Sequence, residues 1–409
     1  MHTKKQRDEL CATKEPTVPL STPPLFTTKN VFCEEEGPRE PRFPSNNNRM
    51  NDKKKEGPRE PGFPSRFPFL FADKRALQRA VNKYIQTNGL HCPYGPMGTW
   101  DVSNITDMSH LFQGHDAFNE SLQDWDVSNV VNMECMFGGC SVFNQPLHTW
   151  NVSNVNNMAR MFCQCHAFDQ PLETWNVSNV VNMQAMFYQC HAFNQPLEMW
   201  NVSNVVDMQG MFCECCVFDQ PLDTWDVSNV CNMTCVFANC RCFNQPLAHW
   251  NVSHVCSMVG MFQDCHVFNQ PLQTWNVSNV INMSFLFSNC SVFQTPLNTW
   301  DVSRVYDMSH MFHGCKLFNE PLDAWNVSNV CNTWRMFSGC HAFDQPLDTW
   351  NVSKVVNMAH MFQECLAFQH NLFAWTQRNP RFKAHVDLFS IADQRIHCLN
   401  PERVDYLLK

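Results

Sequence analysis

Tryptophan recurs every 25 residues from Trp100 to Trp375, and these positions account for all but one of the 13 tryptophans in the chain. Around each of them one pattern returns, FNQPLxxWNVSNVxNMxxMFxxC, which is intact over residues 168–190 except that Asp169 replaces Asn. A fixed period of this length is typical of a solenoid, in which each unit buries its apolar side chains only against its neighbours. Function is therefore to be sought on a surface rather than in a pocket.

Each unit is predicted to contain one short helix and one short strand. Ser128, whose equivalent occurs in all eleven units, is the expected helix N-cap, and Pro146 ends the helical segment. The alternation of apolar and polar residues over 150–152 predicts a strand. The apolar residues between cap and proline have the spacing of one helix face, and in one unit they are Val130, Met133, Met136, Phe137 and Cys140.

The fold class that follows is α/β, a right-handed solenoid like that of leucine-rich repeats, built from eleven 25-residue repeats with helical caps. Identical residues are expected to stack inward in ladders, with Asn144 and Gln145 joining successive turns through amide-to-backbone hydrogen bonds. The predicted domains are a disordered tail rich in proline and charge (1–66), an N-terminal helical cap (67–99), the solenoid (100–375) and a C-terminal helical cap (376–409).

The two caps are predicted from apolar patterns at each end of the array. Asp73 is the expected N-cap of a helix, and a second helix is expected to open at Asn400, Pro401 and Glu402. The apolar face of the first helix comprises Leu77, Ala80, Val81, Tyr84 and Ile85. The corresponding apolar residues of the second cap are Phe382, Val386, Leu388, Phe389 and Ile391.

Charge divides the chain into two parts. Residues 1–85 hold 17 Lys or Arg against 11 Asp or Glu, a balance of +6, whereas residues 86–375 hold 6 against 23, a balance of −17. An acidic array repels the phosphate backbone, so the solenoid is not expected to bind nucleic acid. No stretch is apolar and long enough to span a membrane, and no signal peptide is evident at the start.

No motif for catalysis is found. The chain contains no GxSxG elbow, no P-loop and no GxGxxG after a predicted strand, so we predict no enzyme activity, no catalytic residue and no cofactor. A metal site is the alternative that the cysteines raise, with Cys163, Cys165, Cys213 and Cys215 as the ligands to consider first. The absence of a CxxC pair argues against metal, and the sequence predicts none.

Cysteine is abundant but mostly periodic. Ten of the 23 cysteines occupy a single position of the repeat, from Cys140 to Cys365. A cysteine ladder facing the core needs no special chemistry, because a free thiol packs as a small apolar group. Reduced thiols are therefore predicted.

The motif WDVSNITDMSHLF at residues 100–112, together with the recurring FNQPL, resembles the repeat of BspA-like surface proteins. This is a domain of unknown function found in mycoplasma lipoproteins, other bacteria and large DNA viruses, and the resemblance covers residues 94–375. It implies a leucine-rich-repeat-like fold and surface placement, with no assigned chemistry. The chain departs from the family in lacking a lipoprotein or secretory signal and in its ladder cysteines, which disfavours surface display.

These observations predict a non-enzymatic repeat scaffold that binds another protein, with self-association as a further option. The alternatives are an adhesin exported by an unrecognised route and a cysteine-rich protein that responds to metal or redox state. Without a signal peptide the chain is expected to stay in the cytoplasm or the compartment of its synthesis, in a viral or host-cell context among others. The predicted interaction face consists of exposed acidic residues at one repeat position, namely Glu173, Glu198, Asp223, Asp323 and Asp348.

Overall fold

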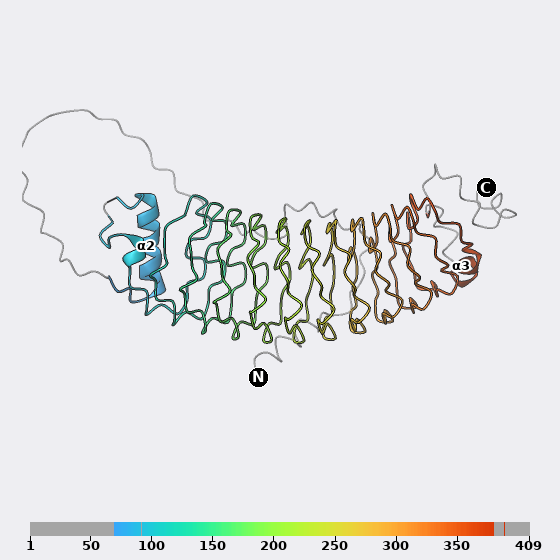
Figure 1. The fold of residues 1–409 in the computed structure, drawn as a ribbon, viewed down its shortest axis with the longest axis horizontal. Helices are drawn as coiled ribbons and strands as arrows, with labels where there is room; N and C mark the ends of the chain where they lie inside the picture. The colour runs from blue at the N-terminus through green and yellow to red at the C-terminus, as the bar shows by residue number, and fades with distance from the viewer. Residues whose placement is uncertain (1–68, 91, 380–387, 389–409) are drawn as a thin grey trace, which may run out of the picture. The chain divides into compact units, whose positions relative to one another are not determined.

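The computed structural model describes residues 69–90, 92–379 and 388. From Trp100 onward each 25-residue segment that begins at a Trp forms one coil, and successive coils lie side by side (Figure 1). Residues one period apart face each other, as the indole rings of Trp175 and Trp200 show, 6.5 Å apart and inclined by only 1°. The chain is therefore a repeat solenoid, as the period predicts.

The coils are built differently from the prediction. Between residues 100 and 372, all of which are described, the structure has neither an α-helix nor an extended strand. Isolated parallel bridges instead join equivalent residues of neighbouring coils, as between Asn132 and Asn157. Both the helix expected after Ser128 and the strand expected at residues 150–152 are wrong, and with them the α/β composition of the unit.

Tight turns take the place of the helix. The amide of Met136 bonds the carbonyl of Met133 in a turn, while the amide of Cys135, between them, bonds Ala159 of the next coil at 2.9 Å. Cys135 has a φ of 51° and Gly139 a φ of 80°, the left-handed conformation that a type II turn requires at its third residue. Amides that a helix would pair internally are thereby directed to the neighbouring coil.

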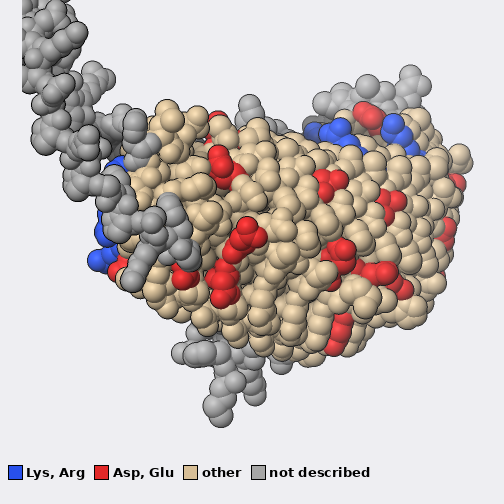
Figure 2. Space-filling view, turned by 60° about the vertical axis from the view of Figure 1, so that its left-hand side comes forward, with Lys and Arg blue, Asp and Glu red and all other residues tan. Residues whose placement is uncertain are grey.

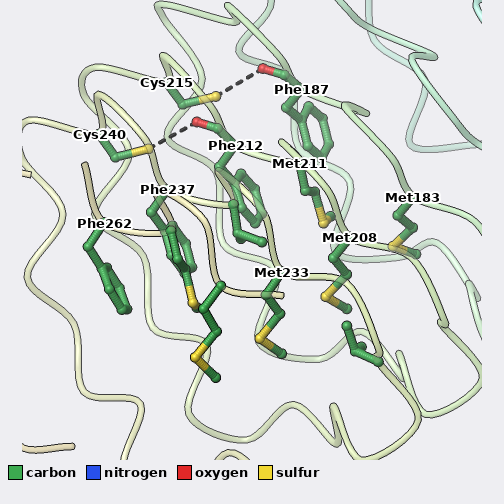
Figure 3. Packing of buried hydrophobic residues seen from close by; sticks show 14 of the residues in the cluster. Met183, Phe187, Met208, Met211, Phe212, Cys215, Met233, Phe237, Cys240 and Phe262 are labelled. Carbon is green, nitrogen blue, oxygen red and sulfur yellow. Dashed lines mark hydrogen bonds between the residues drawn. The ribbon is translucent and has the colours of Figure 1, made fainter. Parts of the chain in front are cut away.

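Columns of identical side chains fill the space inside the coils. From Trp150 to Trp375, the indole N–H of each ladder tryptophan donates to the carbonyl of the leucine 28 residues earlier, as from Trp225 to Leu197 at 3.0 Å. The thiols of the ladder cysteines also donate to backbone carbonyls, as from Cys215 to the carbonyl of Phe187 at 3.0 Å (Figure 3). The inward placement predicted for Trp and Cys is confirmed, since Trp225 is 3% exposed and Cys215 is fully buried.

Asparagines and glutamines join the coils at the surface. The Oδ1 of Asn119 accepts both the backbone amide of Asn144 at 2.9 Å and the side-chain amide of Gln145 at 3.2 Å. In the next coil the Oδ1 of Asn144 accepts the backbone amide of Asp169 and the side-chain amide of Gln170. The predicted amide-to-backbone ladder is confirmed for asparagine, whereas Gln145 and Gln170 bond a side-chain oxygen.

The serine predicted as a helix cap lies in an Asx turn instead. The backbone amide of Ser153 donates to Oδ1 of Asn151 at 3.2 Å. Some units have aspartate in place of this asparagine, as at Asp126 and Asp301. Hydrogen bonds from the hydroxyl and the backbone amide of the serine two residues later hold the pKa of each of these aspartates below the usual range.

A helix precedes the first coil. Helix α2 spans Lys74–Gln86, and the predicted cap Asp73 accepts the amide of Ala76 at 2.8 Å. Its face with Leu77, Ala80 and Val81 is buried, as predicted. Lys74 bonds Asp107 at 2.9 Å, and this ion pair joins the helix to the coil that begins at Trp100.

Two shorter elements complete the described part. The 3-10 helix η1 covers Met97–Thr99, and α3 covers Phe373–Arg378 after the last coil. Leu388 is buried, and its carbonyl accepts the amide of Phe362. The predicted tail (1–66) and the helix predicted from Asn400 lie outside the described residues, as do Phe382, Val386, Phe389 and Ile391.

Candidate interaction surfaces

The five acidic residues predicted as an interaction face occupy one position of the coil, between a buried Leu and a buried Trp. For Glu173, near the end of the coil that begins at Trp150, these neighbours are Leu172 and Trp175, the first residue of the next coil. Because Leu and Trp fix the backbone on either side, the residue between them is directed to the surface. Of the five, Glu173, Glu198, Asp323 and Asp348 are exposed, while Asp223 is half-buried.

The backbone of this column is held by a threonine ladder. The hydroxyl of Thr174 donates to the carbonyl of His148 at 2.8 Å, and Thr224 donates in the same way to Glu198 at 3.0 Å. These carbonyls belong to the same column, so the threonines fix the spacing of the acidic residues from one coil to the next. The column therefore presents side chains from a rigid backbone.

The structure brings these acidic residues together in two groups rather than one. Glu173, Glu198 and Asp223 follow one another in successive coils, whereas Ala248, Gln273 and Asn298 separate them from Asp323 and Asp348. Asp223 is already bonded, since its Oδ1 accepts the amide of His249 at 2.9 Å and its Oδ2 lies against the ring Nδ1 of the same residue. Asp323 accepts a hydrogen bond from the side chain of Asn298 at 3.0 Å.

Among the charged residues of the coils, acidic residues outnumber basic ones. On the face drawn in Figure 2 the acidic side chains are spread over many coils, while the basic side chains gather toward its two sides. This distribution agrees with the balance of −17 over residues 86–375. A partner that approaches this face meets a negative potential, which favours basic ligands and disfavours polyanions.

Sequence reasoning missed a second surface, an exposed apolar column at the residue before the phenylalanine of FNQPL. Val142, Val217 and Leu317 belong to it, with exposed fractions of 47%, 42% and 46%. Every coil has an apolar residue at this position: Ala117, Val142, Ala167, Ala192, Val217, Cys242, Val267, Val292, Leu317, Ala342 and Ala367. The sequence signal was present, because polar residues never occur there although the position faces solvent.

The cysteines that raised a metal alternative lie in the core. Cys165 and Cys215 are fully buried, and their thiols donate to the carbonyls of Phe137 and Phe187. Burial raises the pKa of these thiols well above the usual value, which keeps them protonated. Cys163 and Cys213 are buried as well, and within the described residues no group of three His, Cys, Asp or Glu side chains could hold a metal ion.

The family of the chain follows from its sequence profile. The profile described as "Mycoplasma protein of unknown function, DUF285" matches three times, over residues 81–200, 186–298 and 282–396. The chain belongs to the DUF285 family. This agrees with the resemblance to BspA-like repeats, and the three matches of the DUF285 profile together span every coil described above.

Other comparisons add little to the DUF285 assignment. No match was found among curated proteins. A solved structure titled "Crystal structure of TLR13-ssRNA13 complex" is similar at 9% identity and a TM-score of 0.22, covering 70% of this chain and 56% of that one. Similarity at that score carries no argument about fold or ligand. Within the described residues no helix has the length and apolar character needed to cross a membrane.

Proposed function

We propose that this chain is a non-enzymatic scaffold whose solenoid surface binds another protein through a basic segment of that partner. In this proposal eleven repeats form a right-handed array closed by helical segments at both ends. The observation that carries it is the contrast between the coil interior, where identical residues recur in register, and the acidic outer column, where residues vary from coil to coil. A constant core holds the coils in register, while an outer column that varies from coil to coil can match the surface of one particular partner protein.

The charge of the array indicates the class of partner. Glu173 and Glu198 stand on consecutive coils, exposed, on a backbone held by threonine hydroxyls. A basic segment lying across the coils would meet them one after another. Electrostatic complementarity of this kind raises association rates and selects partners more than it raises affinity, and salt weakens it.

The test is charge reversal in this column. The double variant Glu173→Lys with Glu198→Lys is compared with Asp116→Lys with Glu120→Lys, which makes the same change in net charge at exposed residues elsewhere. Asp223 is left unchanged because its reversal would also break its bonds to His249. Proteins retained from an extract of the native source are quantified for each variant and for a chain lacking residues 1–66.

The proposal predicts that one set of proteins is retained by the wild type, by the control pair and by the chain without residues 1–66. The Glu173→Lys/Glu198→Lys variant does not retain this set of proteins, and the wild type retains less of it as salt is added. Retention by residues 1–66 alone, or equal loss in both charge-reversed pairs, would show that the column is not the binding surface.

A further inference from the structure

Buried polar side chains are concentrated in one region of the solenoid. Within the described residues, only Ser109 and Asn379 of this class lie outside the coils that begin at Trp275, Trp300 and Trp325. Those inside these coils are Ser284, Ser288, Thr295, Ser309, His310, Thr333 and Ser338. Burying polar groups is unfavourable unless they are paired, so a local concentration of them needs a physical explanation.

A column of aromatic and cationic side chains runs through this region. His310, Arg335 and His360 occupy one turn position in successive coils, with φ values of 56°, 53° and 58°. Phe285 precedes them in the column, and its ring stacks on that of His310 with centroids 4.4 Å apart and planes inclined by 8°. The column therefore places a guanidinium group between two imidazole rings.

Neighbouring positions hold this column in place. The ring of Trp334 meets His310 edge-on with centroids 4.6 Å apart, and the guanidinium carbon of Arg335 lies 5.4 Å from the centroid of the Trp334 ring. The ring of His313 lies 5.4 Å from that of His310. Stacking and cation–π contacts fix the planes of these groups.

The nitrogen atoms of this cluster lack acceptors. The Nδ1 atoms of His310, His313 and His360 and the Nε of Arg335 are buried and have no hydrogen-bond partner among the described residues. His310 itself is only 6% exposed. The Nε of Arg335 always carries an N–H, and each neutral imidazole can carry its single proton on Nδ1. Leaving such a buried donor unpaired costs about 1–3 kcal/mol, and an acceptor at these atoms would remove that cost.

We propose that the three imidazoles and the guanidinium of Arg335 form a binding site for a small oxyanion, either a phosphate or a carboxylate group. Arg335 supplies the permanent charge, since a guanidinium is protonated at every physiological pH and donates in a planar fork. The imidazoles supply further donors at the sides. The site goes beyond the scaffold proposal and uses none of the acidic column residues.

Protonation of the imidazoles links this site to pH. Burial, with the positive charges of His313 and Arg335, lowers the pKa of His310 to about 3. Burial also lowers the pKa of His313. A hydrogen bond to the backbone of Ser338 acts against burial, as do the carboxylates of Glu364 and Asp264, while Arg335 acts in the same direction as burial. A bound anion would raise both pKa values by favouring the charged rings. Binding should therefore take up protons and strengthen as the pH falls.

The experiment is a calorimetric titration of the full chain with sodium phosphate and, separately, with sodium acetate, at constant ionic strength and at pH 6 and pH 8. Arg335→Ala removes the guanidinium, and it is compatible with the turn because Ala185 occupies the equivalent position. Arg304→Ala is the matched control, an exposed arginine of a neighbouring coil whose side chain bonds Asn279. The two salts distinguish a phosphate ligand from a carboxylate ligand.

We expect saturable binding of at least one anion to the wild type, tighter at pH 6 than at pH 8. Affinity should be unchanged in Arg304→Ala and at least tenfold weaker in Arg335→Ala, with circular dichroism checking that each variant is folded. Arg335→Lys keeps the charge but loses the planar fork, so its anion affinity should lie between those of the wild type and Arg335→Ala. It replaces the alanine variant in the comparison if that variant does not fold. No saturable binding of either anion, or equal affinity in the wild type and the Arg335 variants, would mean that water satisfies these nitrogens and that the proposal is wrong.

Discussion

At the scale of single residues, the interior of the solenoid repeats one set of contacts in every coil. The tryptophan is the largest member of that set, and it combines burial, ring stacking and a hydrogen bond to the carbonyl of a leucine 28 residues earlier. Its inward position could be predicted from the sequence, because a large apolar residue repeated without a slip has to face the shared core. The hydrogen bond of its N–H could not, since it depends on the exact path of the neighbouring coil.

Replacing Trp225 by Ala should destabilise the chain by about 3–5 kcal/mol, because the variant leaves a cavity and loses the hydrogen bond from the indole to the carbonyl of Leu197. Met199→Ala is the control, since Met199 is 76% exposed and its loss should cost little. Chemical denaturation of both variants measures the difference. Equal stability of Trp225→Ala and the wild type would refute the inward assignment.

His310 should make stability depend on pH. The pKa of His310 is lowered to about 3 in the folded chain, whereas an unfolded histidine has a pKa of about 6.5. Below the unfolded value the unfolded chain binds a proton that the folded chain does not, so stability falls as the pH drops from about 6.5 toward 3. With allowance for solvent screening, the loss at pH 5 is on the order of 1 kcal/mol.

The His310→Phe variant should lack this component of the acid sensitivity, because a Phe at the equivalent Phe285 already stacks in the same column. The free energy of unfolding is measured at pH 7 and pH 5 in a buffer without phosphate or carboxylate. Identical pH dependence in the wild type and the variant would show that His310 is not the group responsible.

At the scale of the element, the unit is a coil of tight turns rather than a strand and a helix. The spacing of Val130, Met133, Met136 and Phe137 fits a helix face, but the same residues are buried in a coil of tight turns whose amides bond the neighbouring coil. Periodicity alone does not separate these two conformations. Glycine distinguishes the turn from the helix, because Gly210 and Gly260 lie in the middle of the segment predicted to be helical.

Gly210 tests this conformation directly. Its φ is 63°, and a Cβ added there would meet nothing closer than the Cβ of Cys213 at 3.9 Å, so Gly210→Ala changes backbone strain without a clash. The alanine variant should be less stable by about 1–2 kcal/mol. Gly210→Asn should cost less, because asparagine tolerates the left-handed region. A helical segment would reverse the expectation, since alanine would then be stabilising.

At the scale of the whole molecule, the described coils form a stack, and the scaffold proposal concerns the side chains that this stack presents outward. The sequence located the acidic column correctly on the surface but could not show that it falls into two groups or that Asp223 is bonded to His249. It also missed the exposed apolar column, although every coil has an apolar residue at that position, because a repeated apolar residue is expected to face the core. These gaps arise from contacts between coils, which a single repeat does not contain.

Hydrogen–deuterium exchange of the full chain with a retained partner tests the scaffold account most directly, because it locates the partner on the surface. The account predicts slower exchange on binding for the amides flanking Glu173, Glu198 and Asp223, and no change along the apolar column at Val142 and Val267. Slower exchange confined to residues 1–66, or confined to the apolar column, would contradict it.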